Sequence, residues 1–182
     1  GATGFAAVTF TATDDCGNAS STTATFIIVD NTPPTIDNEA TDETITCDAN
    51  SAALLQAWLA ANGNASAIDI CGGVTWSNDY TDNISDDCGA TGAAIVTFTA
   101  TDDCGNASTS SATFTIIDNT APEITTNASD TTVECDGSGN TTELNDWLAA
   151  NGNAVSTDDC SNVTWSNDFT VLSDECGTTG AA

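Results

Sequence analysis

Apolar and polar residues alternate along two long stretches of the chain. In residues 7–13, Val8, Phe10 and Ala12 are separated by threonines, the period of two that is typical of a half-buried β-strand. The turn-forming letters Asp-Asp-Cys-Gly-Asn follow at 14–18, and residues 21–29 form a second apolar stretch. The pattern predicts a β-hairpin, and residues 95–117 repeat it.

Two other stretches have helical spacing. Residues 51–62 read SAALLQAWLAAN and residues 141–151 read TTELNDWLAAN. The leucines and the tryptophan of each stretch fall on one helix face, so each predicts a short helix. The residues expected to cap and stop these helices are Ser51, Thr141, Gly63 and Gly152.

The chain contains four tryptophans, one in each predicted helix and one in each copy of the sequence Val-Thr-Trp-Ser-Asn. By alternation, Trp76 and Trp165 fall on strands. We expect all four indoles to lie in hydrophobic cores, because large aromatic side chains dominate the cores of small domains.

The whole pattern repeats with a period of about 88 residues. Residues 9–20 and 97–108 are the same twelve letters, TFTATDDCGNAS, and the helix returns 89 positions later. Repetition at a fixed period is typical of arrays whose units stack on their neighbours. Proline-containing joints at 30–34 and 118–122 divide the units, since proline blocks strand continuation. We therefore expect residues 1–33 to be the C-terminal part of a preceding repeat, 34–121 a complete repeat, and 122–182 the N-terminal part of a following repeat.

Strands, hairpins and turn spacing predict an all-β fold of tandem immunoglobulin-like β-sandwiches, each with one short helical insertion. The run VTFTATDDCGNAS, a Thr/Ser-rich strand and then DNTPP or DNTAP resembles the hyalin-repeat (HYR-like) and related immunoglobulin-like modules. Such modules occur in tandem in large secreted bacterial surface proteins. The resemblance covers essentially the whole chain, and it implies structural or adhesive extracellular work rather than catalysis.

The eight cysteines and the absence of histidine indicate a disulfide framework formed in an oxidising compartment. The cysteine spacing does not suit a zinc site. Placing the joint and the hairpin turn at opposite ends of a sandwich favours the pairs Cys47–Cys104 and Cys71–Cys88, while the two other pairings remain open. The same reasoning pairs Cys160 with Cys176. It leaves Cys16 and Cys135 to pair with neighbouring copies.

The chain has 27 acidic residues and no lysine, arginine or histidine, for a formal net charge of −27. This excludes nucleic acid and anionic membrane surfaces as partners, because both need cations. The sequence has no apolar run long enough for membrane insertion. Calcium could supply the missing positive charge, since it binds carboxylate and carbonyl oxygens. The alternative is that the acidic and amide side chains simply form turns. The candidate ligands are Asp14, Asp15, Asp30, Asn31, Asp102, Asp103, Asp118 and Asn119.

Short sequons suggest glycans on the surface. The candidate sites are Asn18, Asn64, Asn83, Asn106, Asn127, Asn140, Asn162 and, in an Asp-Thr-Thr motif, Thr131. Catalysis and an organic cofactor are not expected, because the chain has no histidine, lysine or arginine and no phosphate-binding loop.

We expect a structural segment of an extracellular filament or surface stalk, built from disulfide-stapled and calcium-stabilised repeats. The expected partners are neighbouring copies of itself along a fibre axis, and glycans. The alternative is an adhesin or carbohydrate-binding module, for which Tyr80 and Phe169 are the candidate aromatic platform.

Overall fold

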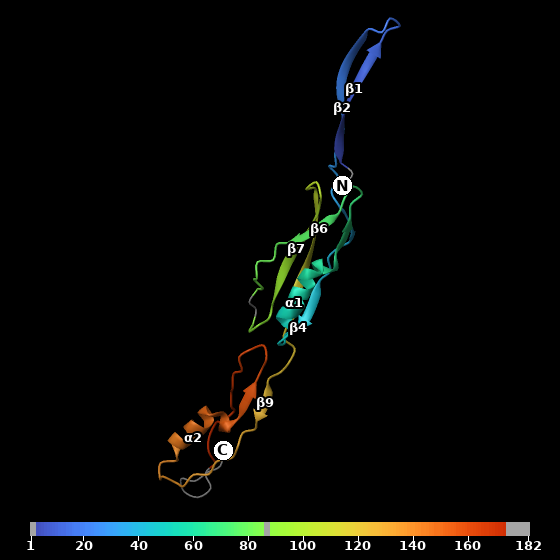
Figure 1. The fold of residues 1–182 in the computed structure, drawn as a ribbon. Helices are drawn as coiled ribbons and strands as arrows, with labels where there is room; N and C mark the ends of the chain where they lie inside the picture. Colours follow the sequence, from blue (N-terminus) through green and yellow to red (C-terminus); the bar gives the residue numbers. More distant parts are fainter. Residues whose placement is uncertain (1–2, 86–87, 174–182) are drawn as a thin grey trace.

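A computed structural model describes residues 3–85 and 88–173. It is built mostly of β-sheet with two short α-helices, which confirms the all-β class. The elements follow one another along an elongated molecule, with a hairpin at one end and α2 at the other (Figure 1). Three names are used below: the N-terminal hairpin (residues 4–28), the middle segment (34–121) and the C-terminal segment (122–173).

The N-terminal hairpin consists of β1 (Gly4–Thr13) and β2 (Ala19–Ile28), which pair antiparallel with Gly4 opposite Ile28. The hairpin itself is as predicted, but its expected half-burial is wrong. Every residue of both strands is exposed, and Phe10 and Phe26 expose 59% and 67% of their surface. Neither face of this ribbon is covered by the described chain (Figure 1).

The middle segment contains a four-stranded sheet with the order β4-β8-β7-β6. Strand β4 runs parallel to β8, and the other pairs are antiparallel. Strands β3 and β5 form a separate antiparallel pair. The bounds are β3 Thr35–Asn38, β4 Glu43–Thr46, α1 Ser51–Ala60, η1 Asn62–Asn64, β5 Ser66–Ile68, β6 Val74–Asn78, β7 Gly92–Asp102 and β8 Ala107–Ile117.

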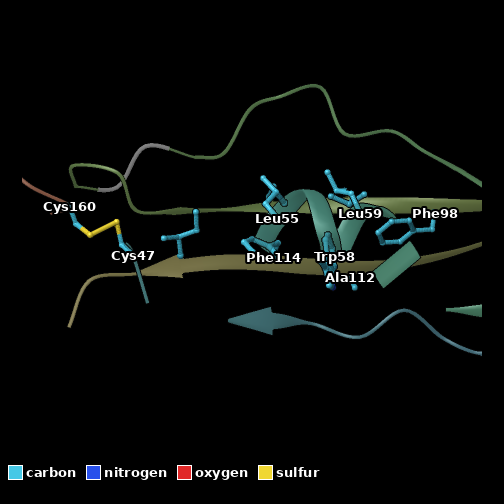
Figure 2. Close-up of a cluster of buried hydrophobic side chains, with 11 residues drawn as sticks. Cys47, Leu55, Trp58, Leu59, Phe98, Ala112, Phe114 and Cys160 are labelled. Atoms are coloured by element: carbon cyan, nitrogen blue, oxygen red, sulfur yellow. A yellow bond between two sulfur atoms is a disulfide. The ribbon is translucent and has the colours of Figure 1, made fainter. Parts of the chain in front are cut away.

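The core of the middle segment lies between α1 and the β7–β8 hairpin. Phe98 and Phe114, one from each strand, are completely buried. The Trp58 ring of α1 lies over both of them, with centroid separations of 5.2 Å to Phe98 and 5.4 Å to Phe114 (Figure 2). Burial of each such side chain contributes roughly 1.5–3 kcal/mol, so this cluster is the main source of stability in the segment.

Helix α1 begins at Ser51 itself, one residue earlier than a Ser51 cap would require. Asn50 occupies the N-cap position without a side-chain cap, and the Ser51 hydroxyl instead accepts a hydrogen bond from the Asp48 amide at 2.9 Å. Thr141 is likewise the first helical residue of α2, after Asn140 at the N-cap. The predicted caps are therefore wrong by one position, because the preceding loops close on their own hydrogen bonds.

Gly63 has the left-handed conformation, with φ +62°, but it does not stop the helix as predicted: α1 ends at Ala60, and Asn62, with φ +55°, is the first left-handed residue after it. Gly63 also lies directly against the core, because a Cβ built there would be 2.7 Å from Cε2 of Phe98. A side chain at this position would therefore displace the Phe98 ring. The glycine serves both the backbone turn and the close approach of the helix end to β7.

The C-terminal segment contains β9 (Glu123–Thr126), α2 (Thr141–Ala149), η2 (Asn151–Asn153) and β10 (Val155–Thr157). Strands β9 and β10 pair as β3 and β5 do. Residues 131–134 and 163–167 stand at the positions of β4 and β6, and neither segment is a strand. The expected strand and core position of Trp165 are therefore wrong, and this side chain is 40% exposed.

Two identical sequence positions should differ sharply in their contribution to stability. We expect Phe98→Ala to lower the free energy of unfolding by about 3–5 kcal/mol, because it empties a buried site. Phe10→Ala, at the same position of the repeated sequence, should change it by less than about 0.5 kcal/mol. Urea unfolding of dilute protein measures both. Equal losses would show that the N-terminal hairpin is buried in solution.

Candidate functional site

The joint between the middle and C-terminal segments is bridged by a disulfide. Cys47 and Cys160 are bonded across 113 positions of sequence, with their Cα atoms 5.9 Å apart (Figure 2). Cys47 follows β4, and its amide donates to the Ile117 carbonyl at 2.7 Å, at the end of β8. Both cysteines are buried. The bond therefore ties the end of one sheet to the loop after β10.

The predicted pairing of Cys47 with Cys104 is wrong. Cys104 lies in the β7–β8 turn, at the opposite end of β8 from Cys47. The 11 residues of β8 extend roughly 35 Å at 3.3 Å per residue, which separates the two cysteines. The prediction assumed that the β7–β8 turn lies far from the joint at residues 30–34. In the structure the middle segment starts at one end of its sheet and stops at the other end, so this turn lies beside the joint that precedes β3.

The structure also lacks the predicted Cys71–Cys88 pair, and it bonds Cys160 to a residue other than the predicted Cys176. Cys71 precedes β6, whose first residue Val74 pairs with Asp102 at the end of β7, whereas Cys88 precedes the start of β7. Neither forms a disulfide in the structure. Cys160 is bonded to Cys47, and its expected partner Cys176 lies outside the described residues. The pairing of Cys16 and Cys135 with neighbouring copies stays a prediction.

Backbone contacts also hold this joint together. The Ala90 amide, in the loop before β7, donates to the Cys160 carbonyl at 2.8 Å. Gly89 has φ +60°, and a Cβ built on it would be 2.9 Å from the Ser161 Cα. The loop that carries Cys88 therefore packs closely on the loop that carries Cys160.

Carboxylates gather where the N-terminal hairpin meets the middle segment. Oxygens of Asp30, Asp69 and Asp102 lie within 4.8 Å of one another. Burial, and then the Asp30 and Asp69 carboxylates, raise the pKa of the neighbouring Cys71 thiol. At the second joint, Asp118 and Asp158 approach the Cys160 sulfur in the same way, although that sulfur is bonded to Cys47. The oxygens of the first cluster are of the kind that a divalent cation binds.

Asp69 and Asp158 were not among the candidate calcium ligands, although the sequence contained a signal for both. Each stands two residues before a cysteine, as Asp14 and Asp102 do. In all four cases the carboxylate accepts a hydrogen bond from the cysteine amide, at 2.8–3.0 Å. The spacing Asp-x-Cys therefore marks a local turn, and three of these turns, those of Asp69, Asp102 and Asp158, reach a joint.

Asp14 and Asp102 hold the hairpin turns. Each accepts bonds from the amide and the side chain of the asparagine four residues on, at 2.7–2.8 Å. For Asp102, burial opposes ionisation, but these bonds from Asn106 outweigh it and lower the pKa. Of the other candidate ligands, Asp103 accepts from the Gly73 amide at 3.1 Å, and Asp15, Asn31 and Asn119 are exposed. The turn-forming alternative thus accounts for Asp14.

An open apolar cavity of about 450 Å³ lies on the C-terminal segment. Its lining includes Ile124, Ala128, Trp147, Leu148, Gly152, Trp165 and Phe169. The corresponding residues of the middle segment include Ala40, Trp58, Leu59, Trp76 and Tyr80, which pack against the core formed by β7 and β8. We call this cavity the C-terminal groove.

Four of the seven predicted sequons use their asparagine side chains inside the fold. The amides of Asn18, Asn64, Asn106 and Asn140 donate hydrogen bonds to neighbouring oxygens. Asn83, Asn127, Asn162 and Thr131 are exposed. Asn18 and Asn64 are also exposed, but glycans on Thr131 and the three asparagines named with it would not compete with one of the hydrogen bonds above.

No protein-family model matches the chain, and no curated protein shows significant similarity to it. Among the described residues, neither helix has the length and apolar character needed to cross a bilayer.

Removing the disulfide should weaken the joint. Closing a loop of 113 residues stabilises by about 5 kcal/mol in the chain-entropy model, so Cys160→Ser should lower the urea midpoint markedly. Cys88→Ser, in the same joint but without a disulfide in the structure, is the matched control. The chain has no lysine or arginine and therefore no tryptic sites, so the protein is cleaved at Asp, and mass spectrometry should then recover a Cys47–Cys160 peptide pair. A Cys47–Cys104 pair would contradict the structure.

The loop before α2 should resist acid. Hydrogen bonds from the Ser138 side chain and amide, and from the Asn140 amide, lower the pKa of Asp136 to about 2. Because folding lowers this pKa, the ionised Asp136 carboxylate stabilises the loop at pH values above its ordinary pKa of 3.8. This contribution is lost as the pH falls through about 2. Ser138→Ala should move the NMR titration of Asp136 upward, and an unchanged titration would show that Ser138 does not hold the carboxylate.

Proposed function

We propose that this chain is a structural segment of an extracellular filament or surface stalk. In this proposal its repeats are immunoglobulin-like β-sandwiches joined end to end, stapled by disulfides and stabilised by calcium at the joints. The resemblance to HYR-like modules and the elongated arrangement of the segments support it (Figure 1).

The observation that carries the proposal is the disulfide between segments. A bond inside a unit would stabilise that unit alone, whereas Cys47–Cys160 fixes the C-terminal segment to the end of the middle sheet. Disulfides of this kind persist in oxidising compartments, which supports a secreted location. A chain that fixes its units in line has the property that a filament or stalk needs.

Calcium is proposed for the joint that contains Asp30, Asp69 and Asp102. The three carboxylates come from the joint itself, from the loop after β5 and from the end of β7. Three negative charges within 4.8 Å repel one another, and the chain contains no lysine, arginine or histidine to offset them. A bound cation would remove this repulsion and fix the angle between the hairpin and the middle segment.

No observation favours the adhesin alternative. Its aromatic platform required Tyr80 and Phe169 to stand free on the surface. Tyr80 packs against the core of the middle segment, and Phe169 lines the C-terminal groove. Packing accounts for Tyr80, and Phe169 lies in a groove rather than on a free-standing platform.

Calorimetry and small-angle X-ray scattering of the full chain test the proposal. Calcium at a hundredfold excess over its dissociation constant should stabilise the chain by about 2.7 kcal/mol, and Asp69→Asn should remove this gain. Asp37→Asn, an exposed change on β3, is the control. Scattering should show a rod that bends more when the disulfide is reduced or calcium is chelated. A rod unaffected by either treatment, with no calcium effect on melting, would contradict the proposal.

A further inference from the structure

We propose that a groove beside helix α1 binds the arginine side chain of a partner protein. The groove has a volume of about 530 Å³ and lies on the middle segment, next to the disulfide, where Cys47 is one of its lining residues. We call it the α1 groove. This binding role goes beyond the proposed structural function and does not depend on it.

Apolar side chains from three parts of the middle segment form the inner surface of the α1 groove. Leu55 of α1 and Ile116 of β8 are 4% and 6% exposed. Tyr80 and Ile84, from the loop after β6, are half-buried against the same core. An alkyl stem that lies on this surface is removed from water, so a ligand that fits the groove has an apolar part.

Carboxylates from three different loops line the same groove. Asp48 precedes α1, Asp82 follows β6 and Asp159 follows β10, and all three are exposed. The Cys47–Cys160 disulfide fixes the loop of Asp159 against the middle segment. Because the chain has no lysine, arginine or histidine, a cation that faces these carboxylates comes from outside the chain.

The spacing of the carboxylates distinguishes the possible occupants. Among the described residues, the acidic groups with ligand atoms within 4.8 Å of one another lie at the two joints, at Asp30 and at Asp118. Asp48, Asp82 and Asp159 form no such group, and calcium needs several oxygens around one point. A second copy of this chain has no cationic side chain to offer. The occupant that suits both the apolar surface and the separated carboxylates is a long cationic side chain of a different protein.

Arginine suits this groove better than lysine. Its guanidinium is planar, donates in several directions and can lie on an aromatic ring, whereas the lysine ammonium is a compact charge. Burial, and then the Asp82 carboxylate, raise the pKa of the Tyr80 hydroxyl, so the carboxylate lies near the aromatic ring. A guanidinium on the Tyr80 ring can therefore donate to Asp82 while its stem lies on Leu55.

NMR titration of the full chain tests the site, because Tyr80 is the only tyrosine and its ring signals are unique. The probe is n-butylguanidinium, which has the charge and the stem of an arginine side chain, and it should shift the Tyr80 signals in a saturable way. Guanidinium lacks the stem and n-butylurea lacks the charge. At equal concentration and ionic strength, each should shift these signals about threefold less.

A pair of variants separates the groove from the general negative charge of the chain. Asp82→Asn should raise the dissociation constant of n-butylguanidinium by about threefold, since it removes one exposed charge pair. Asp37→Asn removes the same charge from the exposed strand β3 and should leave this constant unchanged.

Three results would each overturn the proposal. One is an equal Tyr80 shift with guanidinium or n-butylurea, and another is equal weakening of n-butylguanidinium binding by the two variants. The third is a Tyr80 shift caused by calcium chloride and removed by Asp82→Asn, because the groove would then be a metal site. None of these results would change the calcium effect expected at Asp69, so the proposed function would still stand.

Discussion

The packing of Trp58 across Phe98 and Phe114 is the interaction on which the middle segment depends. The chain has no cationic side chain, so no ion pair can offset the mutual repulsion of its 27 carboxylates. Burial of apolar surface therefore has to stabilise the fold against both chain entropy and charge. The helix contributes one side of this cluster and a single hairpin contributes the other. A segment that lacks either side keeps its local elements but exposes its apolar residues.

The chain shows the same letters in two environments, and the environment decides the outcome. Val-Thr-Trp-Ser-Asn is a strand beside β7 and irregular at 163–167. A strand needs a partner for its backbone groups, so intrinsic propensity alone does not form it. Helix α2, by contrast, forms without burying a residue, because its hydrogen bonds are internal. The helix and the β9–β10 pair thus form in the C-terminal segment, while the segments at the positions of β4 and β6 do not become strands.

This contrast explains which features could be predicted. The hairpins and helices follow from periodicity and glycine, and both were predicted within a few residues. The disulfide was not, because pairing depends on the direction in which the chain crosses the sheet, and the parallel β4–β8 pair reverses the assumed direction. Asp69 was missed because its turn lies far in sequence from Asp30 and Asp102. Trp165 was misplaced because alternation indicates a strand face but not whether anything covers it.

The parallel pairing of β4 with β8 also determines how the molecule would respond to pulling. Tension would enter near Thr35 and leave after Ile117, which draws β4 and β8 past each other along their length. Their hydrogen bonds would then be loaded together in shear rather than opened one at a time. Cys47 lies at the loaded end of this pair, and its bond to Cys160 carries force into the next segment without passing through residues 118–122. Mechanical strength in such a chain resides in a covalent path that bypasses the joint between two segments.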